Sequence, residues 1–316
     1  MNILALPALW YLRTFPGKID ESYGLIEKLN LESDMSKGDW QSIENKMSQL
    51  SPDEFSRVIS ELCNGKQYNN EIESFLQTPE TEFQNLIAGC YFTSVGYLKR
   101  SGSWARDLSE DQINGMFEYL GKAEERLGQN FPTESYQLEA SARMIGVQMN
   151  TGTKADCTYF FERCRTINPK HFMAHLRYFR VSTPRWGGSN EAMLSLIAST
   201  KDKPLKDMLR LMTLNQMFSD LYNEDEETAV GEFKEQRRTL ITEALQNTQI
   251  PNNDSIVSIY SKNFLGMLYN ILGMYKDRDR IIDGLSNRVT SLPWAYYGMH
   301  CEKDLKMFRR VGMLKF

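Results

Sequence analysis

The sequence has few of the residues and motifs that mark a chemical centre. It contains 3 histidines and 5 cysteines, with no CxxC pair, Gly-x-Ser-x-Gly elbow, P-loop or GxGxxG loop. These absences argue against the common signatures of zinc-binding, hydrolase and nucleotide-binding sites. No pattern places two isolated carboxylates in an apolar cleft, so acid/base catalysis has no support. We therefore expect no catalytic residues and no cofactor.

The cysteines do not suggest a disulfide framework. Their number is odd and no CxxC pair occurs among Cys63, Cys90, Cys157, Cys164 and Cys301. A small secreted domain stabilised by disulfides normally carries an even number at regular spacing. We expect reduced, mostly buried thiols in a cytoplasmic protein.

Long hydrophobic runs are also missing. The longest apolar stretch is the N-terminal MNILALPALWYL, which Pro7 interrupts and which lacks the basic residues that open a signal peptide. It is too short to span a bilayer. We expect this segment to pack on the core and the protein not to enter a membrane.

An excess of basic charge is absent as well. The formal net charge is -4 and the pI is about 5.6. Nucleic-acid binding requires a basic face toward the phosphates, so this balance argues against a nucleic-acid partner. It is compatible with a basic protein partner.

The sequence does contain clear signals for the starts and ends of helices. Hydrophobic residues make up 41% of the chain, enough for a sizeable core. Ser51-Pro52-Asp53-Glu54 and Ser109-Glu110-Asp111-Gln112 are capping boxes that predict helix starts. Further on, the spacing predicts one helix from Val230 to Leu245. Alternating strand patterns are almost absent, which predicts an all-α fold.

A weak internal repeat indicates how the helices are arranged. Glu125-Arg126-Leu127 followed by Phe131-Pro132 recurs as Glu162-Arg163-Cys164 followed by Asn168-Pro169, about 37 residues later. This period is typical of stacked helix pairs. We expect a tetratricopeptide-like array of antiparallel helix hairpins, similar to an α-solenoid. It would occupy residues 1–222, with residues 223–316 continuing or capping it after an acidic turn.

The segment FERCRTINPKHFMAH resembles the helix-turn-helix of tetratricopeptide-type repeats. From Asp39 to Ala198 the chain is similar to an uncharacterised bacterial helical domain family. The shared features are Tyr91-Phe92 with Gly96, a helix from Lys122-Ala123 to Leu127, the Asn168-Pro169 turn and the corner Pro184-Arg185-Trp186-Gly187-Gly188-Ser189. The resemblance implies a tetratricopeptide-like fold and carries no catalytic residues.

Two patterns admit a chemical interpretation beside a structural one. The Gly187-Gly188 corner could hold an anion at the next helix N-terminus with help from Arg185, or be a tight turn with Trp186 as a packing wedge. His171 and His175 share a helix face and could bind zinc with Cys157, Cys164 or Asp156, or be a structural pair. We favour the structural interpretation in both cases and expect no metal.

The expected partner-binding residues are aromatic, basic and acidic. Tyr, Trp and Arg are the usual anchors of protein interfaces, and acids attract a basic partner. The residues are Tyr159, Arg177, Tyr178, Arg185, Trp186, Glu224, Asp225, Glu226 and Glu227. Although the four acids could simply be a solvated helix-capping run, we expect a non-enzymatic, protein-binding protein. Its most concrete form is an immunity protein that occludes a secreted antibacterial toxin. The alternatives are a scaffold or chaperone adaptor, and an enzyme with an unfamiliar helical site.

Overall fold

The computed structural model describes residues 20–101, 107–285, 288–297 and 302–310, together with Trp10, Thr14 and Met299. Every regular element in these ranges is a helix, so the predicted all-α class is confirmed. The helices form two compact units, and the division falls between Val181 and Ser182. The seam that the sequence suggested, after residue 222, lies inside the second unit.

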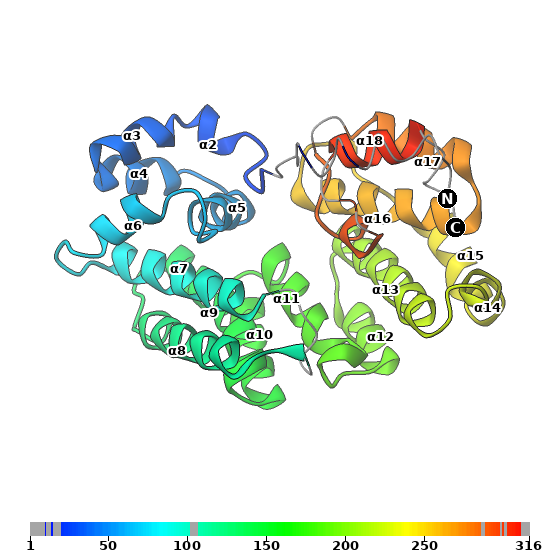
Figure 1. Ribbon diagram of the computed structural model, residues 1–316, viewed down its shortest axis with the longest axis horizontal. Coiled ribbons are helices and arrows are strands. Elements are labelled where there is room, and N and C mark those ends of the chain that lie inside the picture. The colour runs from blue at the N-terminus through cyan, green and yellow to red at the C-terminus, as the bar shows by residue number, and fades with distance from the viewer. Residues whose placement is uncertain are drawn as a thin grey trace. The chain divides into compact units, whose positions relative to one another are not determined.

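The first unit begins at Asp20 and contains ten helices among its described residues (Figure 1). These are α2 (Leu25–Lys28), α3 (Leu31–Lys37), α4 (Trp40–Met47), α5 (Pro52–Leu62), α6 (Asn69–Phe75), α7 (Glu82–Arg100), α8 (Glu110–Leu127), α9 (Glu134–Thr151), α10 (Lys154–Ile167) and α11 (Phe172–Ser182).

The predicted helix starts are present because their capping interactions are local. Ser51 Oγ accepts a hydrogen bond from Glu54 N–H, and the Glu54 carboxylate accepts one from Ser51 N–H at 3.1 Å. Ser109 and Gln112 form the same reciprocal pair at the start of α8. Both capping boxes satisfy amide groups that the first helical turn leaves free.

Neighbouring helices of the first unit pack as antiparallel hairpins. Gly96 of α7 faces Leu120 of α8, while Gly89 faces Leu127, so the two helices run in opposite directions. A Cβ at Gly89 would lie 2.4 Å from Leu127 Cγ, so only glycine allows this close approach. In the next pair, the thiols of α10 donate to carbonyl oxygens of α9 in the same antiparallel order.

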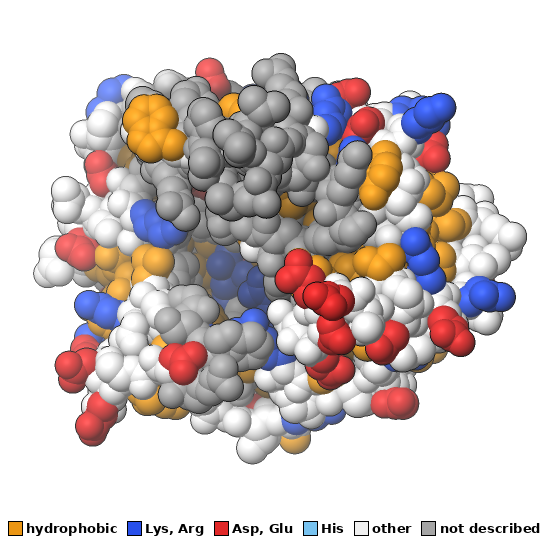
Figure 2. Space-filling model, turned by 45° about the vertical axis from the view of Figure 1, so that its right-hand side comes forward, with side chains coloured by type: hydrophobic (Ala, Val, Ile, Leu, Met, Phe, Trp, Pro, Cys, Tyr) orange, Lys and Arg blue, Asp and Glu red, His pale blue; other side chains and the backbone are white. Residues whose placement is uncertain are grey.

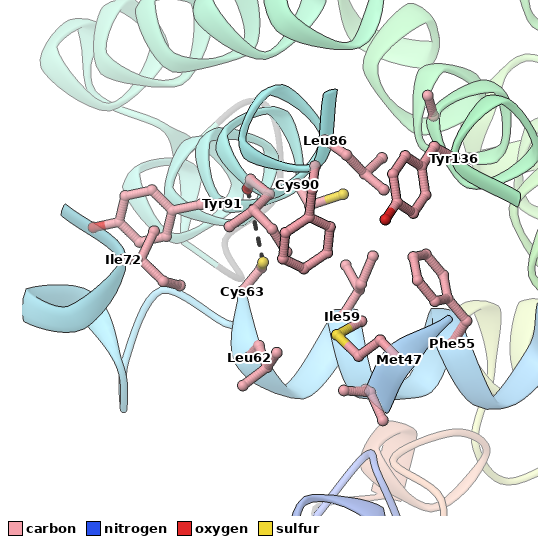
Figure 3. Packing of buried hydrophobic residues seen from close by; sticks show 14 of the residues in the cluster. Met47, Phe55, Ile59, Leu62, Cys63, Ile72, Leu86, Cys90, Tyr91 and Tyr136 are labelled. Carbon is pink, nitrogen blue, oxygen red and sulfur yellow. Dashed lines mark hydrogen bonds between the residues drawn. The ribbon is translucent and has the colours of Figure 1, made fainter. Parts of the chain in front are cut away.

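The hydrophobic core of the first unit lies between α4 and α5 on one side and α7 and α9 on the other. Figure 3 shows Met47, Phe55 and Ile59 facing Leu86 and Tyr136. Phe55 and Tyr136 stack with their ring centroids 5.8 Å apart. The cysteines at 63 and 90 are buried in the same core as free thiols, as the sequence predicted.

The second unit contains the described residues from Ser182 onward. Its helices are α12 (Asn190–Ser199), α13 (Lys203–Glu224), α14 (Ala229–Gln236), α15 (Arg238–Asn247), α16 (Ile256–Leu272), α17 (Tyr275–Asp283) and α18 (Glu302–Arg310), with short 3-10 turns η2 (Pro184–Trp186) and η3 (Trp294–Tyr297). The single helix predicted from Val230 to Leu245 is wrong, because the chain breaks at Arg237 into α14 and α15. The buried side chains of Phe233 and Ile241 both pack inward across this break.

A buried asparagine fastens the loop that follows α17. Asn263 of α16 donates from Nδ2 to the carbonyl oxygens of Ile259 at 2.9 Å and Arg288 at 3.0 Å. Its Oδ1 accepts from Thr290 N at 3.2 Å and from Trp294 Nε1 at 2.7 Å. One side chain therefore holds the segment from Arg288 to Trp294 against α16.

Candidate functional site

The corner between α11 and α12 is a closed turn. Trp186 N and Gly188 N both donate to Thr183 O, at 3.0 and 2.9 Å, and Ser189 N donates to Ser182 O at 3.0 Å. Gly187 has a φ of +77°, and a Cβ at Gly188 would lie 2.1 Å from Ser182 O. Both glycines are thus required by the backbone geometry, which agrees with the structural interpretation of the corner.

An anion bound at this corner would need free backbone N–H groups, and the chain itself already uses those of Gly188 and Ser189. The amides of Gly188 and Ser189 bond to the turn itself, and Ser189 Oγ accepts from Ala192 N at 3.1 Å as the cap of α12. The Glu191 carboxylate also lies at this helix start. Hydrogen bonds from its own backbone N–H and from Ser189 lower the pKa of Glu191. A carboxylate of the chain therefore takes the place that an external anion would need.

Trp186 is half-buried and Arg185 is exposed. Replacing Trp186 with alanine should lower the free energy of unfolding by about 1–2 kcal/mol, less than the loss for a fully buried tryptophan, because the side chain is only partly buried. Urea denaturation of the second unit checks this value. Unchanged stability combined with loss of partner binding would instead make the corner a binding site.

Tyr159 and Tyr178 occupy different environments, although the sequence groups them. Tyr159 on α10 is 61% exposed, and its ring meets Phe160 edge-on with centroids 5.1 Å apart. Tyr178 on α11 stacks flat on Phe161 at 4.1 Å, and its hydroxyl shares a hydrogen bond with Thr158 at 2.9 Å. Tyr159 is available to a partner, whereas Tyr178 is largely used in joining α10 to α11.

Tyr159 lies in the middle of an outward-facing row on α10. We call this row, Ala155, Tyr159, Glu162 and Thr166, the Tyr159 stripe; all four residues are exposed. Their spacing of three or four residues places them on one helix face. Arg165 Nη1 donates to Glu162 Oε1 at 2.9 Å beside it. The stripe therefore has an aromatic centre with polar neighbours, as protein interfaces do.

The acidic segment from Glu224 to Glu227 is exposed at the end of α13. Tyr222 donates to Glu226 Oε1 at 2.6 Å, and Glu227 N donates to Asp225 Oδ1 at 2.9 Å, so these contacts fix its conformation. On the face drawn in Figure 2, a group of Asp and Glu side chains lies near the middle of the view with hydrophobic side chains beside it.

The predicted partner-binding residues belong to both units. Tyr159, Arg177 and Tyr178 lie in the first unit, whereas the corner residues and the acidic segment lie in the second. Arg177 differs from the expectation for a surface anchor, since its Nη1 atom is buried within the unit. We therefore consider the Tyr159 stripe and the acidic segment as separate candidate surfaces.

His171 and His175 are each only 1% exposed. His175 Nδ1 hydrogen-bonds to His171 O at 2.9 Å, and its ring meets Phe161 edge-on at 5.0 Å. The thiols of Cys157 and Cys164 donate to backbone carbonyls at 3.6 and 3.7 Å. Among the described residues, no three His, Cys, Asp or Glu side chains lie together in a way that could hold a metal ion.

Sequence reasoning missed a polar cluster inside the first unit. We call it the buried cluster: Ser56 of α5, Glu139 and Arg143 of α9, and His171 before α11. Arg143 Nε donates to Glu139 Oε1 at 2.5 Å, and its Nη2 donates to Ser60 Oγ at 2.8 Å. Ser56 Oγ donates to the other oxygen of Glu139 and contacts His171 Nε2 at 3.1 Å.

Electrostatics fix the charge states in the buried cluster. Burial raises the pKa of Glu139, but the guanidinium groups of Arg143 and Arg177 outweigh this and lower it to about 2. Burial also lowers the pKa of His171 to about 4, so this imidazole is neutral at pH 7. Because the Ser56 hydroxyl donates its hydrogen bond to the Glu139 carboxylate, Ser56 Oγ accepts a hydrogen bond from His171 Nε2–H.

This arrangement differs from that of a serine nucleophile. In a catalytic triad the acid orients the histidine, and the histidine accepts the serine proton. Here the serine hydroxyl donates its hydrogen bond to Glu139, and His171 Nδ1 has no hydrogen-bond partner among the described residues. Ser56 is completely buried as well. The buried cluster thus joins α5, α9 and the start of α11 as a packing element.

Asp53 connects α5 to the start of α11. Its Oδ1 accepts a hydrogen bond from Phe172 N at 3.0 Å, which caps α11 from another helix. Burial raises the pKa of Asp53 to about 6, although the Phe172 hydrogen bond lowers it. His171 Nε2 lies 3.9 Å from the same carboxylate oxygen.

Comparison with known proteins finds a family match over part of the chain. A family model described as a domain of unknown function (DUF4034) matches residues 133–215. This span includes the Asn168-Pro169 turn and the Pro184–Ser189 corner. The expected resemblance began at Asp39, and the family model does not cover residues 39–132 of that region. No curated protein and no solved structure matches the chain. Within the described residues, no helix is long and apolar enough to cross a membrane.

Proposed function

We propose that this chain is a non-enzymatic protein-binding helical protein, and that the Tyr159 stripe contacts the partner. The observation that carries the proposal is the 61% exposure of Tyr159 on a helix whose opposite face is fixed in the core through Phe161 and Cys164. An exposed tyrosine has only two side-chain torsions to order on binding, and it offers both apolar area and a hydroxyl group. Such residues are frequent energetic centres of interfaces.

In its most concrete form, the protein is an immunity protein of a bacterial cytoplasm that neutralises a cognate antibacterial toxin. Its helix hairpins would act as a tetratricopeptide-like binding surface, and binding would occlude the toxin's active cleft. The exposed acids from Glu224 to Glu227 support a basic partner, because complementary charge accelerates the encounter. A general scaffold or chaperone adaptor would use the same type of surface but would bind several partners.

Replacing Tyr159 with alanine should weaken partner binding roughly 30-fold or more, the effect of a hot-spot residue worth about 2 kcal/mol. The partner is first captured from the native cell with the wild-type chain and then titrated calorimetrically against each variant. Tyr159→Phe should retain most of the affinity because it keeps the ring.

Met274→Ala serves as the matched control, since Met274 is a 37% exposed hydrophobic residue in the second unit. It should leave the affinity unchanged. Equal affinities for wild type and Tyr159→Ala would show that the Tyr159 stripe is not the binding surface. Capture of many unrelated proteins with similar affinity would favour the adaptor over the immunity protein.

A further inference from the structure

Arg177 on α11 carries a positive charge that no described residue pairs directly. Its Nη1 atom is buried and has no hydrogen-bond partner in the described part of the chain. The buried arginines each have a hydrogen-bond partner: Arg143 bonds to Glu139 and Ser60, and Arg278 bonds to Asn270 and Asp279. Arg57 donates from Nη2 to Ser22 O at 2.8 Å, although its Nε has no partner among the described residues. A buried guanidinium group without a partner is costly, so Arg177 calls for an explanation.

The acid that acts electrostatically on Arg177 already forms hydrogen bonds with other residues. Glu139 acts on Arg177 electrostatically, but its two oxygens accept hydrogen bonds from Arg143 and Ser56. Burial and the neighbouring charge of Arg143 lower the pKa of Arg177 to about 10, so it remains protonated at pH 7. The Arg177 charge is therefore only partly balanced within the unit.

The surroundings of Arg177 have a positive potential. Arg180, Arg177 and Arg100 all act on the Tyr97 hydroxyl, and their charges oppose the rise in its pKa that burial causes. That hydroxyl donates to Gly146 O at 2.8 Å and accepts from Asn150 Nδ2 at 2.9 Å. Arg177 as a whole residue is half-buried, whereas its Nη1 atom is buried.

Gly146 of α9 leaves room beside the guanidinium stem. A Cβ at this position would lie 3.7 Å from the Tyr97 hydroxyl and 4.0 Å from Arg177 Cδ, which are ordinary contact distances. Arg177 is thus approached from α7 and α9 by a hydroxyl group and by bare backbone.

We propose that Arg177, where α11 meets Tyr97 of α7 and Gly146 of α9, binds a small oxyanion of the carboxylate or phosphate class through Nη1. The planar guanidinium group matches two oxygens of such an anion, and a charge-assisted hydrogen bond is strong in a partly buried place. The inference is independent of protein binding by the Tyr159 stripe.

The test is an NMR titration of the arginine side-chain N–H signals in the full-length chain, with inorganic phosphate in one arm and acetate in the other. Sodium chloride keeps the ionic strength constant, which removes general screening. The Arg177 signal should shift and saturate in at least one arm, and the arm with the tighter binding identifies the source of the oxyanion. Arg177→Met should lower the affinity roughly tenfold or more.

Two further variants make the result decisive. Arg163→Met removes a half-buried arginine of α10 and should leave the titration unchanged. Arg177→Lys keeps the charge but loses the planar fork, so it should bind more weakly than wild type. Arg177→Met should also melt at a higher temperature than wild type in anion-free buffer, since it removes an unpaired charge. Absence of a saturable shift in both arms, or equal binding by wild type and Arg177→Met, would overturn the proposal.

Discussion

Replacing Glu139 with alanine should lower the free energy of unfolding of the first unit by about 3–5 kcal/mol. Glu139 is only 1% exposed, and its carboxylate accepts hydrogen bonds from Arg143 and Ser56. Removing it leaves the Arg143 guanidinium buried without its counter-ion, and the charges of Arg143 and Arg177 then repel each other. Hydrogen exchange resolved to α9 measures this loss separately from the second unit.

A double variant separates the loss of the ion pair from the loss of packing. Glu139→Leu combined with Arg143→Met replaces the pair with apolar side chains of similar length, so no partner of the pair stays charged. It should lose less stability than the sum of the two single variants. Additive losses would mean that the two side chains contribute independently, in conflict with the 2.5 Å contact between them.

Replacing Asn263 with leucine should destabilise the second unit by about 2–5 kcal/mol. The change leaves the buried N–H groups of Thr290 and Trp294 without acceptors, and each such group costs about 1–3 kcal/mol. The Trp294 indole is completely buried, so water cannot easily replace the lost partner. Exchange of the Trp294 indole proton, followed by NMR, should become much faster.

The matched control for this prediction is Asn252→Leu, which makes the same change at an exposed position before α16. It should alter stability by less than about 0.5 kcal/mol. If Asn263→Leu behaved like the control, the four hydrogen bonds of Asn263 would not be what holds the segment from Arg288 to Trp294.

The helix starts could be predicted because their physical cause is local. Ser51 with Glu54 and Ser109 with Gln112 each form within a single turn, and both were found as predicted. The break at Arg237 could not be predicted, because no Pro or Gly marks it. The packing of Phe233 and Ile241 determines where the helix breaks, and this packing depends on the fold of the whole unit.

The buried cluster was missed for a related reason. Glu139 and Arg143 are four residues apart on a helix, which is also the spacing of ordinary surface ion pairs. Their burial depends on α5, which lies more than 80 residues earlier in the chain. For the same reason, the sequence could not tell the exposed Tyr159 from the stacked Tyr178.

The most direct test of the proposed function is co-expression in bacteria of this chain with the product of the adjacent toxin-like gene. An immunity protein should restore growth and purify together with the toxin in a stable complex. The Tyr159→Ala variant should protect less at equal expression, whereas Met274→Ala should protect as well as wild type. Unchanged toxicity, with no complex recovered by either chain, would contradict the account.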